Sequence, residues 1–245
     1  MATLLHTLLR ATAFRSPFLR TLIPSIGAAF TIQAAFAIPS ILLGPTERYY
    51  DLSGSLTYIS CTILSLYLPT LRARAAAAGA TGVGSGGAST AWPSVIGSLL
   101  GKANAGVNVW NWRQVVLSAA VLIWATRLGT FLFQRISGEA GRDSRFDGLR
   151  ESPVKFFGAW MAQATWVSLC LMPVLAVNSL TPGMLATRLP GIKITDVLGL
   201  AMYAGGILLE ATADRQKSAW MEDKKEKKHE EGFCTRGLWS LSRHP

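Results

Sequence analysis

Charged residues are scarce in this sequence for its length. Of 245 residues, 16% are Asp, Glu, Lys or Arg, whereas 50% are hydrophobic, and the mean hydropathy is +0.31. A water-soluble domain usually carries about a quarter charged residues, and a disordered chain combines high charge with low hydrophobicity. The composition therefore excludes disorder, argues against a soluble globule and predicts an integral membrane protein.

Cysteine is scarce as well. The three cysteines, Cys61, Cys170 and Cys234, lie far apart, and no two of them have the spacing of metal ligands. An odd and scattered set of cysteines forms neither a disulfide framework nor a zinc site. We therefore expect no bound metal.

Long stretches without charge predict the membrane-spanning segments. Three are uncharged throughout, namely Leu22–Leu43, Leu52–Leu71 and Phe156–Val177. Two more, Gln114–Gln134 and Val197–Ala213, each carry one charged residue toward the C-terminal end, where a long side chain can reach the membrane surface. Since a bilayer core needs roughly 20 apolar residues in a helix, we expect an all-α fold, a multi-span transmembrane helical bundle with about five spans present.

Two segments lie outside this pattern. Residues 1–20 contain three arginines and no acid, so they form a basic N-terminal segment that suits a mitochondrial transit peptide or an amphipathic end on a membrane surface. Residues 73–112 are a low-complexity loop insertion, rich in Ala, Gly, Ser and Thr at their start. The remaining chain, 21–245, reads as one membrane domain.

The distribution of Lys and Arg predicts the orientation. Five spans place the loop 136–155 and the C-terminal tail on the same side, and that side carries more Lys and Arg than the other. By the positive-inside rule it faces the cytosol.

Polar residues gather on this cytosolic face and require an explanation. Glu210, Asp214 and Lys217 fall at i, i+4 and i+7 and line one helix face, which indicates either interhelical salt bridges or contacts with a ligand. Arginines in the loop after the third span suit phosphate, because the guanidinium donates two parallel charge-assisted bonds. Acids among these arginines make the loop mixed in charge, which argues against a nucleic-acid-binding stripe.

The order of these motifs resembles the membrane family DUF1295, of the steroid 5α-reductase C-terminal group. The resemblance covers roughly residues 45–72 and 110–245. It is carried by the runs Arg127-Leu128-Gly129, Asp143-Ser144-Arg145, Ala213-Asp214-Arg215-Gln216-Lys217, Gly237-Leu238-Trp239 and Ser242-Arg243-His244-Pro245.

The resemblance implies an enzyme that uses NADPH to reduce a carbon–carbon double bond in a steroid or other lipid. It implies location in the endoplasmic reticulum, with a mitochondrial membrane as the alternative, and a cofactor pocket open to the cytosol between helix ends. Carried over onto this sequence, the cofactor-binding candidates are Arg135, Asp143, Arg145, Glu210, Asp214, Gln216, Trp239, Arg243 and His244. Tyr58 and Tyr67 are candidates for the proton donor, but no motif assigns it.

Two alternatives stay open. The Arg-His-Pro ending also resembles isoprenylcysteine and phospholipid methyltransferases, which use S-adenosylmethionine; that cofactor has no phosphate, so the arginines of loop 135–155 would be unnecessary. Relatives continue after Arg-His-Pro with Asn-Tyr-x-Gly-Glu and further apolar segments. We therefore expect C-terminal spans to be missing here, and the third possibility is an inactive truncated membrane protein.

Overall fold

All the regular secondary structure in the described part of the chain is helical. This computed structural model describes residues 2–79, 92–99, 110–138, 142–242 and 245, and no strand occurs among them. The chain divides into two compact units, residues 1–188 and 189–245. Unit 1 contains α1 (Ala2–Ala11), α2 (Pro17–Leu42), α3 (Tyr50–Gly79), α4 (Val95–Leu99), α5 (Trp112–Gly138), η1 (Ser144–Phe146), α6 (Asp147–Arg150), α7 (Pro153–Ser179) and α8 (Pro182–Arg188). Unit 2 contains α9 (Ile194–Lys225) and η2 (Gly237–Ser240).

Four of these helices are long and apolar enough to cross a membrane: α2, α5, α7 and α9. They contain four of the five predicted spans and confirm the helical membrane bundle. Pro173 lies inside α7 without ending it, since the helix continues to Ser179. On length and composition, the protein is an integral membrane protein.

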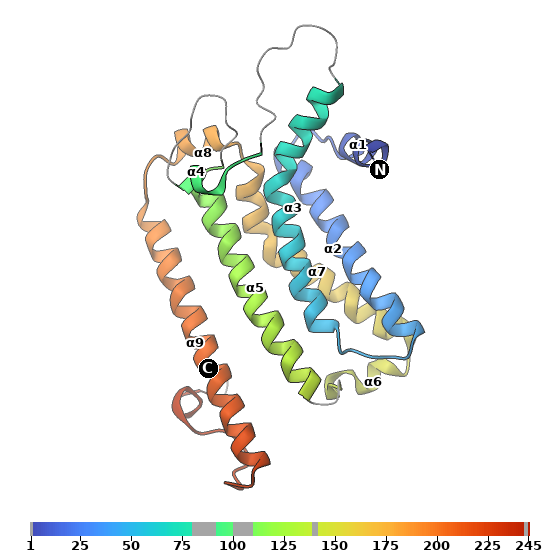
Figure 1. Cartoon of the computed structure of the whole chain (residues 1–245), viewed down its shortest axis with the longest axis vertical. Helices are drawn as coiled ribbons and strands as arrows, with labels where there is room; N and C mark the ends of the chain where they lie inside the picture. Colours follow the sequence, from blue (N-terminus) through green and yellow to red (C-terminus); the bar gives the residue numbers. More distant parts are fainter. Residues whose placement is uncertain (1, 80–91, 100–109, 139–141, 243–244) are drawn as a thin grey trace. The chain divides into compact units, whose positions relative to one another are not determined.

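The fifth predicted span, residues 52–71, lies in α3, which is not among those four helices. α3 packs against α2, α5 and α7, and Figure 1 shows it running between them. Its buried side chains include several hydroxyls, among them Ser53, Thr57, Thr62 and Ser65. A helix surrounded by protein can carry such polar residues, because other helices rather than lipid cover them. Its lower hydropathy therefore reflects its central place in the bundle.

Buried hydrogen bonds join α3 to its neighbours. The Gln33 side chain of α2 donates from Nε2 to Thr57 Oγ1 at 2.8 Å and accepts from Ser53 Oγ at 3.1 Å. These bonds satisfy polar groups that lipid could not satisfy. They fix the register of α2 against α3.

Small residues bring the helices into close contact. A Cβ at Gly129 of α5 would lie 2.5 Å from Ser55 Cβ of α3, and a Cβ at Gly54 would lie 2.5 Å from Gln163 Nε2 of α7. Glycine at such positions lets backbones approach, as is common between membrane helices.

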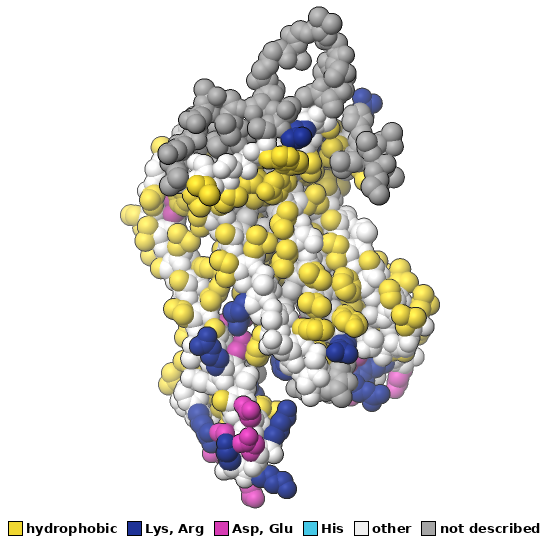
Figure 2. Space-filling model, in the orientation of Figure 1, with side chains coloured by type: hydrophobic (Ala, Val, Ile, Leu, Met, Phe, Trp, Pro, Cys, Tyr) yellow, Lys and Arg dark blue, Asp and Glu magenta, His cyan; other side chains and the backbone are white. Residues whose placement is uncertain are grey.

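Charge and apolar surface are separated along unit 1. In Figure 2, hydrophobic side chains cover the flanks of its helices, and a group of Lys, Arg, Asp and Glu side chains lies at the end that carries α6. Within unit 2, α9 changes character along its length. Its N-terminal half carries Asp196 in the first turn and then exposes Val197, Leu198, Leu200, Met202, Leu208 and Leu209. The next charged residue is Glu210, and more charges follow it. An exposed run of this kind matches a lipid-facing helix.

The low-complexity insertion falls mostly outside the described residues. Its described parts are the end of α3, residues 92–99 with α4, and residues 110–112 at the start of α5. Within unit 1, the basic N-terminal segment is tied to α3 by Arg72, which donates to the carbonyl oxygens of Leu9, Thr12 and Arg20.

Candidate functional site

The loop after α5 is anchored by a buried carboxylate. Glu47, between α2 and α3, is 2% exposed. It accepts hydrogen bonds from the Arg150 guanidinium, with Nε to Oε2 at 2.9 Å, and from the backbone N–H of Asp143 at 2.5 Å. Arg150 also donates to the Asp143 carbonyl at 3.0 Å. Both ends of the segment 143–150 are thus held at the start of α3.

The electrostatics of this anchor favour the ionised pair. Burial alone would raise the pKa of Glu47, but the hydrogen bonds from Arg150 and from the Asp143 N–H outweigh it, so the pKa lies below its ordinary value. The Glu47 carboxylate correspondingly raises the pKa of the Arg150 guanidinium. Because Glu47 is buried, removing its partner Arg150 would leave the carboxylate charge without compensation, which is costly.

Aromatic side chains form the second anchor of the loop. Phe146, in η1, is buried and meets the Tyr50 ring edge-on, with centroids 4.8 Å apart, and the Phe156 ring at 6.0 Å. Tyr50 also meets Trp160 at 5.3 Å and donates its hydroxyl to the Ala159 carbonyl at 3.1 Å. Edge-to-face pairs add to the burial of these large rings. The loop is therefore a fixed part of unit 1.

Three of the nine predicted site residues lie on or beside this loop. Asp143 Oδ2 accepts from Arg145 Nε at 2.9 Å and from Nη2 at 2.6 Å, and Asp143 Oδ1 caps the backbone N–H of Arg145. These bonds hold the pKa of the Asp143 carboxyl below its usual range, and the charge of Arg135 lowers it further. Arg145 is 64% exposed and Arg135 is exposed in the last turn of α5. Two solvent-accessible guanidinium groups thus flank one carboxylate.

In unit 2, the chain folds back onto the polar half of α9. Trp239 Nε1 donates to the Ala213 carbonyl at 3.0 Å, and the backbone N–H of Leu238 donates to Gln216 Oε1 at 2.9 Å. Lys217 Nζ lies 4.6 Å from the Trp239 ring centroid and 5.1 Å from that of Trp220. A cation between two indole faces is favourable. The structure thus brings the predicted residues Gln216 and Trp239 together.

A glycine permits this return of the chain. Gly237 has φ +58°, a backbone conformation that residues other than glycine rarely adopt. A Cβ at this position would also collide with the Gln216 side chain. The Gly237-Leu238-Trp239 motif therefore has a structural role: it turns the backbone and presents the Leu238 N–H to Gln216.

Glu210 and Asp214 lie one turn apart on α9 and both are half-buried. Arg243 and His244 lie outside the described residues. The nine candidates thus fall into one group of three in unit 1 and one of six in unit 2. Their convergence on a single cofactor pocket stays a prediction.

Sequence reasoning missed the residues that position the first group. Glu47 ends an uncharged stretch and Arg150 is one of several arginines in the loop, but their pairing joins residues 103 positions apart. Among the described residues, no group of three or more His, Cys, Asp or Glu could hold a metal ion.

Comparison with known proteins yields one family. No curated protein and no solved structure matches the chain. The model of a family described as a protein of unknown function, DUF1295, matches residues 87–245, from the low-complexity insertion through both groups of site residues to the last residue. With more than half of its length matched, the chain belongs to the DUF1295 family.

Proposed function

We propose that this protein is an NADPH-dependent reductase of a carbon–carbon double bond in a steroid or other lipid. The observation that carries the proposal is a pair of accessible guanidinium groups. Arg135 is in the last turn of α5, and Arg145 is in the following loop, which Glu47 holds at the start of α3. The resemblance of this family to the steroid 5α-reductase group supplies the class of reaction.

The geometry of Arg145 is suited to a phosphate. Asp143 engages Nε and Nη2, so a phosphate would contact Nη1 and the neighbouring Arg135. Because the loop is pinned by two anchors, little conformational entropy would be lost when an anion binds. S-adenosylmethionine would leave this pair of arginines without a role.

The residues of the second group are the remaining cofactor-binding candidates of this proposal. Gln216 Oε1 already accepts from Leu238, so Gln216 would act toward a ligand through its Nε2 donor. Glu210 and Asp214 would accept from ribose hydroxyls, and Arg243 and His244 would donate to phosphate or carbonyl oxygens. NADPH, when bound, supplies the hydride.

The proposal also needs an acid near the lipid carbonyl, where enolate charge develops. Asp51, in the first turn of α3, lies beside the first group, with its Oδ2 3.9 Å from Arg145 Nη2. Tyr58 lies about 10 Å along α3 from Asp51, and Tyr67 about 24 Å, at 1.5 Å per residue. Tyr58 is buried against Trp124, whereas Tyr67 packs on Trp110 at the far end of the helices. Tyr58 is therefore the better candidate for the proton donor.

The test is NADPH binding to the purified chain in detergent, with Arg142→Ala as the matched control for Arg145→Ala. Arg142 is exposed in the same loop but is not one of the site candidates. Loss of a charge-assisted contact predicts binding about tenfold weaker or more in the Arg145 variant and nearly unchanged binding in the Arg142 variant. Absence of NADPH binding would contradict the proposal, and saturable S-adenosylmethionine binding in its place would favour a methyltransferase.

A further inference from the structure

Every Asp and Glu of unit 1 lies in two short stretches of the sequence, residues 47–51 and 139–151. The described parts of these stretches lie around the Glu47–Arg150 pair, at the start of α3 and in the loop after α5. The opposite end, where α2 begins and α3 ends, therefore has no acid among the described residues of unit 1. We call this surface, which carries Arg10, Arg15, Arg20 and Arg72, the arginine end.

Two of these arginines stand where neighbouring helices leave the membrane. Arg20 comes just before the uncharged stretch Leu22–Leu43 of α2. Arg72 directly follows the uncharged stretch Leu52–Leu71 of α3. α2 and α3 pack against each other, and Arg72 Nη2 donates to the Arg20 carbonyl at 3.0 Å. Both residues thus lie at the level of the lipid headgroups, where long cationic side chains reach water.

Hydrogen bonds hold the N-terminal segment at this end. Arg72 donates from Nη1 to the Leu9 carbonyl at 2.5 Å and from Nη2 to the Thr12 carbonyl at 3.1 Å, at the end of α1. Arg20 Nε donates to the Phe14 carbonyl. Figure 1 shows α1 beside the start of α2 and the end of α3. The residues before α2 are therefore part of the surface of unit 1.

The positive charges at the arginine end have no carboxylate partner. All the acceptors that the described part of the chain offers to Arg20 and Arg72 are uncharged oxygens. Burial lowers the pKa of the Arg72 guanidinium, and the charge of Arg20 lowers it further. Arg10 and Arg15 are exposed, and no described residue forms an ion pair or a hydrogen bond with either side chain. An anion bound here would offset the repulsion among these cations.

Apolar side chains are exposed among the arginines. They are Leu8 in α1, Phe14 in the following loop and Leu19 in the first turn of α2. A small soluble anion would leave these side chains in water. A bilayer surface would bury them while its headgroups meet the arginines, as happens with basic amphipathic segments at membrane interfaces. The partner that fits both features is a lipid surface.

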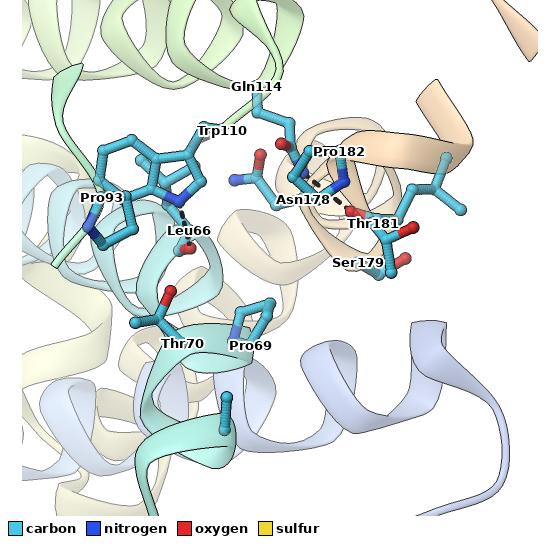
Figure 3. A pocket seen from close by; sticks show the side chains of 12 residues that line it. Leu66, Pro69, Thr70, Pro93, Trp110, Gln114, Asn178, Ser179, Thr181 and Pro182 are labelled. Atoms are coloured by element: carbon cyan, nitrogen blue, oxygen red, sulfur yellow. Dashed lines mark hydrogen bonds between the residues drawn. The ribbon is translucent and has the colours of Figure 1, made fainter. Parts of the chain in front are cut away.

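The cavity at the same end of unit 1 is unsuited to an anion. Its volume is about 260 Å³, and it lies between the second half of α3, the start of α5 and the α7–α8 junction (Figure 3). None of the residues that line it is charged. An anion inside it would lose its hydration without compensation. An anion therefore binds on the outer surface, at the arginine end.

We propose that the arginine end binds the anionic headgroups of membrane phospholipids. Its exposed guanidinium groups contact the phosphate oxygens, and the exposed apolar side chains beside them lie among the acyl chains. Arg72 positions the segment, because its Nη donors are engaged by carbonyl oxygens. This surface is separate from the proposed nicotinamide site and does not depend on it.

The experiment measures how tightly the purified chain, immobilised in mixed detergent micelles, retains radiolabelled dioleoylphosphatidylglycerol or dioleoylphosphatidylcholine. The two lipids share acyl chains and a phosphate, but the choline cation cancels the net charge of the second. We expect the anionic lipid to bind about tenfold more tightly or more, with a preference that weakens as salt is added. Equal binding of the two lipids would overturn the proposal. Displacement of the anionic lipid by inorganic phosphate at constant ionic strength would also overturn it, because it would indicate a site for a free anion.

Two double variants locate the binding surface. Arg10→Gln combined with Arg15→Gln should reduce the preference for the anionic lipid about tenfold or more, since each arginine near such a surface contributes about fivefold. Lys225→Gln combined with Lys227→Gln is the matched control. It removes the same charge from exposed positions in a segment of mixed charge, beside Glu226, and should leave the preference nearly unchanged. Equal losses in the two double variants would show a response to net charge alone and would overturn the proposal.

Discussion

Glu47 and Arg150, 103 residues apart in the sequence, form a buried ion pair in which Nε lies 2.9 Å from Oε2. Glu47 is 2% exposed and the Arg150 side chain 17%. This pair, with the Asp143 N–H bond, joins the start of α3 to the loop that carries Arg145. The position of the candidate phosphate-binding arginine therefore depends on a carboxylate that is not itself a site candidate.

Replacing Glu47 by Gln should destabilise the protein, because the partly buried Arg150 guanidinium loses its main partner. Breaking one side of a fully buried pair costs about 3–5 kcal/mol, and the loss here should be smaller, because Arg150 keeps some contact with water and its bond to Asp147. The measurement is the thermal midpoint of the detergent-solubilised protein. Asp147→Asn is the matched control, since Asp147 also pairs with Arg150, at 2.5 Å, but is 68% exposed and should cost about 1 kcal/mol or less. Equal losses in the two variants would show that the pair is not effectively buried.

Stability should fall in acid because of the same carboxylate. The pKa of Glu47 is below its ordinary 4.5 in the folded protein, so the unfolded chain binds the proton more readily. The stabilisation that the ionised Glu47 carboxylate gives to the folded protein is complete above pH 4.5. It is lost as the pH falls through the pKa of Glu47 in the folded state. Thermal midpoints measured from pH 7 to pH 3 should show the gap between wild type and Glu47→Gln closing below pH 4.5. A difference in thermal midpoint that stayed constant from pH 7 to pH 3 would contradict this link between the Glu47 pKa and stability.

Two glycine-to-alanine substitutions should have opposite effects. At Gly129 the new methyl group would meet Ser55 Cβ at 2.5 Å and force α5 away from α3, so we expect a loss of about 1–3 kcal/mol. At Gly158, in α7, no atom lies within 4 Å of the new Cβ, and alanine should be neutral or stabilise the helix by up to about 1 kcal/mol. Thermal midpoints of both variants test this, and a stable Gly129→Ala protein would exclude the close approach.

Gly237→Ala should release the tail of unit 2 from α9. The substitution strains a φ of +58° and drives a methyl group into Gln216, at a cost of about 1–3 kcal/mol. We expect faster limited proteolysis around residues 226–242 and altered tryptophan fluorescence, as Trp239 leaves the Ala213 carbonyl. Gly232→Ala is the control, since its Cβ would meet nothing within 4 Å. If both variants were cleaved at the same rate, the tail would not depend on this turn.

Hydropathy alone located the helices that face lipid. The uncharged runs around Leu22–Leu43 and Phe156–Val177 correspond to α2 and α7, because a helix in a bilayer must be apolar along its whole length. The same criterion is weaker for α3, whose Ser and Thr residues face protein. The sequence also placed Asp143 and Arg145 together, because only Ser144 separates them.

The sequence alone determined the class of the protein, its family and the segments that carry candidate residues. It did so through apolar runs, charge bias and motif order, which are local properties. Only the tertiary structure decided that Glu47 holds Arg150, that Gly237 lets the tail reach Gln216, and that Asn178 of α7 donates to Ser65 of α3 and Ser118 of α5. These contacts join residues far apart in the chain, and their energies arise from burial, which no short stretch of sequence encodes.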